Sequence, residues 1–128
     1  MNQLERVPFG RIHADVVDFA GAIDRIVALC HAKQGGSVVT PNVDHVVMAE
    51  HDAALKAAYD DADLSLTDGK PLVWLARAMK RPVPGKISGS DLIRPLVARA
   101  AKEGLRCFFL GGKDGIAQTA ADILTAEN

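Results

Sequence analysis

The sequence has almost no net charge. Its 15 lysines and arginines are balanced by 16 aspartates and glutamates, which gives a formal net charge of −1 over 128 residues. General nucleic-acid binders usually carry a basic excess. The balance therefore argues against a nucleic-acid partner, although it is compatible with one local phosphate site.

Cysteine and long apolar runs are also scarce. Cys30 and Cys107 lie in apolar stretches without CxxC spacing, so we expect both to be reduced core residues of a cytoplasmic protein. The charged residues Glu5, Arg6 and Arg11 interrupt the N-terminal region, which therefore does not resemble a signal peptide. No stretch approaches the ~20 apolar residues of a membrane-spanning helix. These features favour a soluble or peripheral protein.

Metal-binding patterns are missing as well. His45 and His51 do not have the HExxH spacing of a zinc site, and their separation places them on opposite faces of a helix. We therefore expect no metal.

The apolar pattern predicts helices alternating with short strands. Helices are expected over residues 16–33, 43–60, 71–79, 88–102 and 116–125. Strands are expected over residues 37–40, 62–66 and 105–110, the last being the clearest. Residues 1–15, with a turn at Pro8-Phe9-Gly10, form either a hairpin or an irregular lead-in. Asp15 is the expected cap of the first helix.

This αβαβααβα order predicts a single α/β domain over residues 1–128. Strands that alternate with helices favour a Rossmann-like fold, with a short parallel sheet covered by helices on both faces. Trp74 and Tyr59 are expected to pack within it. Three short strands make a thin sheet, so we expect either a missing segment or a partner to complete it.

Polar loops follow all three expected strands. They are Pro41 to His45, Thr67 to Lys70, and Gly111 to Gly115. Ligands of open α/β sheets bind at the carboxyl ends of the strands. Three polar loops at one edge of the sheet therefore predict a binding site there.

Each loop also has a purely structural interpretation. Asn42 could simply cap the helix after it, and Asp68-Gly69 is a common turn dipeptide. A carboxylate at a strand end can, however, take a proton from a sugar hydroxyl, and Gly69 would let a substrate approach the backbone. The Gly111–Gly115 loop is either a plain turn or a phosphate site at a helix N-terminus. Its spacing matches neither GxGxxG nor the P-loop.

Four segments together resemble the WecG/TagA/CpsF family of bacterial glycosyltransferases. They are Thr40-Pro41-Asn42, Asp68-Gly69, Ser88-Gly89-Ser90-Asp91-Leu92, and the segment from Phe108 to Ala117. Their order is similar to that of the family over roughly residues 15–125.

The resemblance implies an inverting transfer of an N-acetylhexosamine, such as N-acetylmannosamine, from a UDP-sugar. The implied acceptor is a polyprenyl-diphosphate-linked sugar at the inner membrane face, in cell-surface polysaccharide or teichoic-acid biosynthesis. No cofactor and no essential metal are implied. Asp68 matches the general base. The residues assigned to substrate binding are Thr40, Asn42, Gly69, Lys86, Asp91, Gly111, Gly112 and Lys113.

The sequence departs from the family in two ways. The family usually has Glu-Arg where this chain has Gly85-Lys86, and lysine lacks the bidentate geometry of arginine. Family members are also nearly twice as long, with a Gly-x-Pro-x-Gln-Glu segment and a basic tail that contacts the membrane. We therefore expect an N-terminal portion, completed by a missing C-terminal half or by a homo-oligomer.

Two other interpretations remain open at this point. The chain could be a non-catalytic, flavodoxin-like nucleotide-binding or interaction module. It could also be an inactive truncated fragment that binds nothing.

Overall fold

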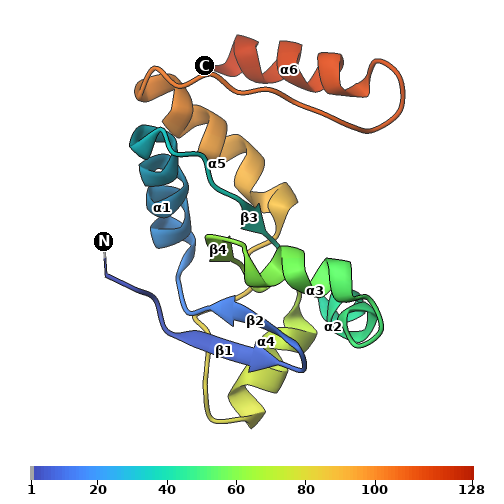
Figure 1. The fold of residues 1–128 in the computed structure, drawn as a ribbon. Helices are drawn as coiled ribbons and strands as arrows, with labels where there is room; N and C mark the ends of the chain where they lie inside the picture. Colours follow the sequence, from blue (N-terminus) through green and yellow to red (C-terminus); the bar gives the residue numbers. More distant parts are fainter. Residues whose placement is uncertain (1) are drawn as a thin grey trace. The chain divides into compact units, whose positions relative to one another are not determined.

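The computed structural model describes residues 2–128, which form four strands and six helices (Figure 1). The strands are β1 (Arg6–Phe9), β2 (Ile12–Asp15), β3 (Val38–Val39) and β4 (Leu64–Ser65). The helices are α1 (Phe19–Ala32), α2 (Val43–Ala49), α3 (Ala53–Asp60), α4 (Lys70–Ala78), α5 (Gly89–Lys102) and α6 (Ile116–Glu127). The chain divides into two compact units, Met1–Ser90 and Asp91–Asn128, which are described separately.

The first unit begins with an antiparallel hairpin of β1 and β2. Its register pairs Arg6 with Asp15 and Phe9 with Ile12. Gly10 makes the turn with a φ of +59°, a conformation that glycine adopts without a steric penalty. In β1 buried side chains alternate with exposed ones, as expected of a strand with one buried face, whereas every residue of β2 is buried or half-buried.

The second sheet is the parallel pair of β3 and β4. Val38 pairs with Leu64, and Val39 pairs with Ser65. The molecule is therefore a mixed α/β protein with a short parallel element, as the strand–helix alternation predicts.

The prediction of a third strand over residues 105–110 is wrong. This segment is irregular, and Phe108 and Leu110 are 87% and 92% exposed. An apolar run becomes a strand only when another strand satisfies its backbone groups, and no strand pairs with it among the residues that the structure describes. The observed order is ββαβααβααα rather than αβαβααβα.

The expected helix over residues 43–60 is two helices, α2 and α3. The break is at Glu50 to Asp52, where the Asp52 carboxylate accepts a hydrogen bond from Leu55 N at 2.9 Å. A side chain that caps a new helix competes with continuation of the old one.

The expected cap of the first helix is also wrong. Asp18, rather than Asp15, caps α1 by accepting from Gly21 N at 2.7 Å. Asp15 is the last residue of β2 and is only 4% exposed. Its carboxylate accepts hydrogen bonds from Ser65 N and Arg6 Nε inside the first unit.

The main core of the first unit joins the hairpin to α4 and the loop after it. Val7, Phe9 and Ala14 pack with Leu72, Ala76 and Val83; in Figure 1 the hairpin crosses α4. A smaller cluster joins Ile12 to Ala49 and Tyr59. Tyr59 is buried, as expected.

Three apolar residues expected in the core are at the surface instead. Cys30 and Cys107 are exposed, and Trp74 is 62% exposed. Cys30 lies near the end of α1, beyond the buried residues of that helix, and Cys107 belongs to the irregular segment that forms no strand. Trp74 lies on the side of α4 away from the core.

The second unit consists of most of α5, the irregular segment after it, and α6. Its buried apolar residues are Leu92 and Ala100 of α5 and Leu124 of α6. An ion pair between Arg94 and Glu127 joins the two helices at the surface.

Candidate functional site

The parallel pair brings two of the expected polar loops together. Leu66 N donates to Val39 O at 2.8 Å, and Asp68 N donates to Pro41 O at 2.9 Å. These hydrogen bonds extend the β3–β4 ladder beyond the strands. The segment at Thr40 to Asn42 and the segment at Thr67 to Gly69 therefore lie side by side at the carboxyl ends of β3 and β4.

A third segment borders the same place. Ile87 N donates to Thr67 O at 2.7 Å, which ties the loop before α5 to the end of β4. A Cβ atom built on Gly89 would lie 3.9 Å from Thr40 Oγ1. The turn from Ile87 to Gly89 thus lies next to the two strand-end loops, and Lys86 immediately precedes it.

Asp68 lies at the centre of this arrangement. Its side chain is half-buried, and within residues 2–128 its carboxylate has neither a hydrogen bond nor an ion pair. Gly69 follows with a φ of +99°, which a residue with a side chain rarely adopts. The glycine turns the chain into α4, so Asp68 stays at the end of β4.

Thr67 is a feature that sequence reasoning missed. The residue is 3% exposed, and its Oγ1 is buried without a hydrogen-bond partner in the part of the chain described. Buried hydroxyls are nearly always satisfied, so this one stands out beside Asp68. The only sequence signal was its position directly before the Asp68-Gly69 turn.

Asn42 acts as the cap of α2. Its Oδ1 accepts from Asp44 N at 3.0 Å and from His45 N at 3.2 Å, while Asn42 N donates to His45 Nδ1 at 3.1 Å. This reciprocal arrangement is a capping box with histidine in the place of the usual Glu or Gln. The structural interpretation of Asn42 is therefore confirmed, and ligand contact by Asn42 stays a prediction.

The hairpin holds β4 from the side opposite β3. Leu64 N and Leu66 N point towards β3, whereas Ser65 N points the other way and donates to Asp15 Oδ2 at 2.8 Å. Ser65 Oγ also donates to His13 O at 2.7 Å. Arg6 Nε donates to the second oxygen of Asp15 at 3.1 Å. The Asp15 carboxylate thus accepts the hydrogen bond that the carbonyl of a neighbouring strand would otherwise accept from Ser65, which lies three residues before Asp68.

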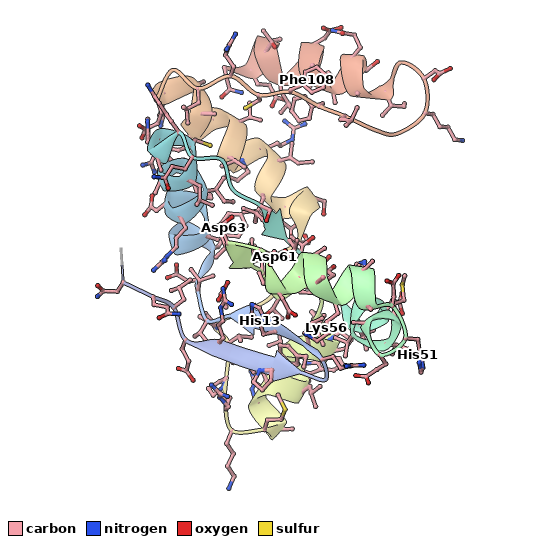
Figure 2. The ribbon with its side chains drawn as sticks, viewed as in Figure 1. His13, His51, Lys56, Asp61, Asp63 and Phe108 are labelled. Carbon is pink, nitrogen blue, oxygen red and sulfur yellow. The ribbon has the colours of Figure 1, made fainter. Side chains whose placement is uncertain are left out.

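His13 lies on the same hairpin, near Lys56 and Asp60 of α3 (Figure 2). Its Nε2 atom is buried and has no partner within residues 2–128. Burial lowers the pKa of His13, and the positive charge of Arg6 lowers it further, although Asp15 and Asp60 act in the opposite direction. The imidazole is therefore held in its neutral form to lower pH than usual.

The remaining expected site residues belong to the second unit, which is described on its own. Asp91 is its first residue, on α5. Gly111 and Gly112 have positive φ values, Lys113 is exposed, and α6 begins after Gly115 without a side-chain cap. The expected loop before a helix N-terminus is present, but the strand expected before it is absent.

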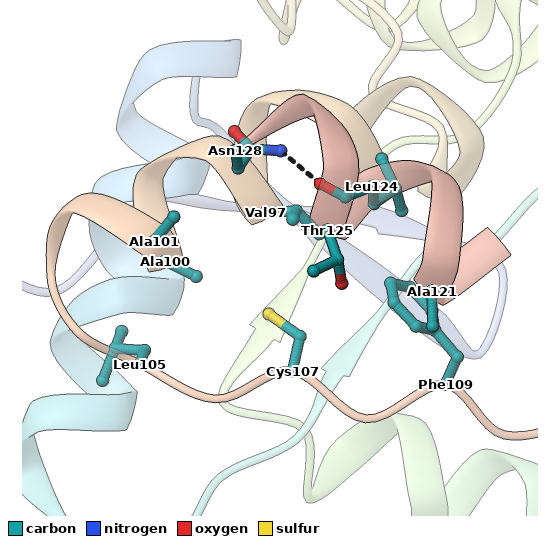
Figure 3. Close-up of a pocket in the computed structure, with 10 residues that line it drawn as sticks. All are labelled: Val97, Ala100, Ala101, Leu105, Cys107, Phe109, Ala121, Leu124, Thr125 and Asn128. Carbon is teal, nitrogen blue, oxygen red and sulfur yellow. Dashed lines mark hydrogen bonds between the residues drawn. The ribbon is translucent and has the colours of Figure 1, made fainter. Parts of the chain in front are cut away.

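The second unit also contains an apolar cavity of about 240 Å³ (Figure 3). The cavity lies between α5, α6 and the irregular segment; its walls include Val97, Leu105, Phe109, Ala121 and Leu124. Asn128 Nδ2 donates to Leu124 O at 2.8 Å at one end. No charged side chain is among the residues that line the cavity.

A comparison with protein families decides the ancestry of the chain. The sequence model described as the glycosyl transferase WecG/TagA/CpsF family matches residues 7–128. The chain belongs to this family. Its general role is therefore that of a glycosyltransferase, and the match includes Thr40, Asp68 and the Gly111–Gly115 loop.

Residues 2–128 contain no group of three or more His, Cys, Asp or Glu side chains arranged to hold a metal ion. None of the helices in that range combines the length and the apolar character needed to cross a bilayer.

Proposed function

We propose that the chain contributes to an inverting transfer of an N-acetylhexosamine, such as N-acetylmannosamine, from a UDP-sugar to a polyprenyl-diphosphate-linked sugar. The family membership supports a glycosyltransferase. The observation that carries the finer proposal is the unpaired, half-buried carboxylate of Asp68 at the ends of two parallel strands. We also propose that this parallel pair belongs to a Rossmann-like sheet.

Asp68 is the general base of the proposed reaction. Its carboxylate takes the proton of the acceptor hydroxyl while that oxygen attacks C1 of the sugar and the UDP oxygen leaves from the opposite face. A group that moves a proton in the transition state typically accelerates a reaction by about 10²–10⁴. The absence of an internal partner favours this role, because no protein cation or donor competes for the oxygens.

The neighbouring residues are proposed to bind the donor. Thr40 and Asn42 lie beside Asp68 along the strand ends, and Gly69 leaves the backbone open to a ligand. Lys86 supplies a positive charge near the turn that precedes α5. Asp91, Gly111, Gly112 and Lys113, in the second unit, are proposed to complete donor binding.

The test is sugar transfer by the Asp68→Asn variant, with UDP binding measured by calorimetry on the same protein. Asn keeps the size of the side chain but cannot take a proton, so transfer should fall by about 10²–10⁴ while UDP binding is retained. Asp61→Asn is the matched control, because Asp61 is an exposed carboxylate at the end of α3. Transfer by Asp68→Asn at the rate of the Asp61→Asn control would remove Asp68 from the mechanism.

A further inference from the structure

The outer surface of α4 has a composition unlike the rest of the molecule. Leu72 and Ala76 face the hairpin core. Trp74 is two residues from each of them, which places it about 160° away around the helix at 100° per residue. Trp74, Leu75 and Met79 are 62%, 44% and 38% exposed. The helix and its C-cap residue Met79 therefore present one aromatic and two long apolar side chains to solvent.

The charged side chains of the segment that contains α4 are all positive. Residues 69–90 contain Lys70, Arg77, Lys80, Arg81 and Lys86 but no aspartate or glutamate, although the whole chain has a net charge of −1. Arg81 is paired with Glu5. Arg77 and Lys80 form no side-chain hydrogen bond or ion pair within residues 2–128, so their charges are available at the apolar surface.

We propose that this α4 surface, made of Trp74, Leu75 and Met79 with Lys70, Arg77 and Lys80, binds the surface of a membrane that contains anionic phospholipid. Apolar side chains beside a row of cations are typical of helices that lie in the lipid interface, where tryptophan is enriched. Cations near such a surface are attracted by anionic headgroups. Nine residues make a helix about 14 Å long, which suits lying on a bilayer rather than crossing it.

Charge complementarity favours a lipid surface over a second copy of the chain. In a symmetric dimer the same patch faces itself, so two α4 surfaces would bring Arg77 and Lys80 next to their own copies. No carboxylate within residues 69–90 could offset that repulsion. An anionic bilayer supplies both the negative charge and the apolar layer that the surface lacks.

The position of α4 connects this surface to the candidate site. The helix begins two residues after Asp68, so lipid contact along α4 would bring the candidate base close to the membrane. The idea that α4 brings the site to a lipid-linked acceptor rests on the proposed function. Lipid binding by α4 is independent of that function, because it requires neither a sugar donor nor an acceptor.

The single tryptophan makes the test direct. The sequence contains one Trp, so its fluorescence reports on position 74 alone. With vesicles of phosphatidylcholine and phosphatidylglycerol, the emission of the 128-residue chain should shift to shorter wavelength and be quenched by brominated lipid. Vesicles of phosphatidylcholine alone should give little change, and added salt should reverse the shift.

Matched variants separate this surface from general stickiness. Arg77→Gln with Lys80→Gln should weaken cosedimentation with anionic vesicles about 30-fold. The control pair Lys33→Gln with Arg106→Gln removes the same two residue types elsewhere and should bind like the unmodified chain. For the apolar part, Trp74→Ser should lose binding, whereas Val47→Ser, which alters a side chain of the same 62% exposure on α2, should keep it. Circular dichroism confirms that each variant is folded.

Several outcomes would overturn the proposal. They are an unchanged emission with anionic vesicles, equal losses in the two lysine–arginine pairs, or an emission shift that follows protein concentration without lipid and indicates a second copy. Failure of the proposed sugar transfer is a separate result. If Asp68→Asn and the unmodified chain bind vesicles equally but neither transfers sugar, the lipid surface stands and the transfer proposal fails.

Discussion

Asp15 shows how much depends on a single buried carboxylate. The residue is 4% exposed and accepts the Ser65 N–H that points away from β3. Asp15→Ala would leave that N–H buried without an acceptor, and we expect a loss of about 1–3 kcal/mol in the free energy of unfolding, measured with urea.

Two variants make the Asp15 result specific. Asp15→Asn keeps an oxygen acceptor and should lose less stability. Arg6→Ala removes only the ion partner of Asp15. Because the Arg6 side chain is 41% exposed, this variant should lose less than about 1 kcal/mol in the free energy of unfolding. Equal losses in Asp15→Ala and Arg6→Ala would show that the ion pair matters more than the bond to Ser65.

His13 makes stability depend on pH. Its pKa is lowered from the usual 6.5, chiefly by burial. The unfolded chain therefore binds a proton near pH 6.5 while the folded chain does not. The free energy of unfolding should be insensitive to His13 above that pH and should fall as the pH drops below it.

The pH dependence can be measured by urea unfolding between neutral and mildly acid pH. His13→Gln should have a smaller acid-side loss than the unmodified chain. His51→Gln, which replaces an exposed histidine, is the control and should retain the full loss. A His13→Gln slope equal to that of the control would contradict the assignment.

At the scale of elements, the capping role of Asn42 can be separated from its proposed ligand contact. Asn42→Ala should lose about 1 kcal/mol, because the amides of Asp44 and His45 lose their acceptor. Asn42→Asp keeps the cap and should keep the stability, as thermal unfolding would show. If Asn42 also binds the UDP donor through its amide, Asn42→Asp should weaken UDP binding despite its normal stability; unchanged binding would leave Asn42 a cap only.

Local signals were enough to predict most elements. The helix after Asn42, the Pro-containing start of α4 and the helix after Gly115 are specified by residues next to them, so the sequence predicts them well. The break between α2 and α3 also had a local signal, the capping side chain of Asp52. The apolar pattern continues across the break, however, and so predicts one helix.

The incorrect predictions concern residues whose secondary structure or burial depends on partners far away in the sequence. The apolar run over residues 105–110 has the composition of a strand, but composition does not specify the strand with which it pairs. The exposure of Cys107 and Phe108 follows from that missing pairing. In the site, parallel pairing of the strands predicts that Thr40 and Asp68 lie close together. The burial of the Thr67 hydroxyl cannot be predicted in this way, because it depends on a distant segment that reaches Thr67 at Ile87.

At the scale of the whole molecule, the two units should differ in protection from hydrogen exchange. Backbone amides of Leu64, Ser65 and Leu66 all donate hydrogen bonds, whereas those of residues 106–110 donate none within the part of the chain described. Mass spectrometry should find slow exchange at Leu64–Leu66 and nearly unprotected exchange over residues 106–110. Strong protection of the latter would show that the segment pairs as a strand in solution.

The bond between Asp15 and Ser65 has a consequence for the order of folding. The hairpin can close within about 1–10 μs because its strands are adjacent. The Asp15–Ser65 bond joins residues separated by 50 positions, and so large a loop closes at a greater entropic cost. The scaffold beneath Asp68 should therefore be among the last parts of the first unit to assemble. In a refolding time course, helical circular dichroism should recover before UDP binding does.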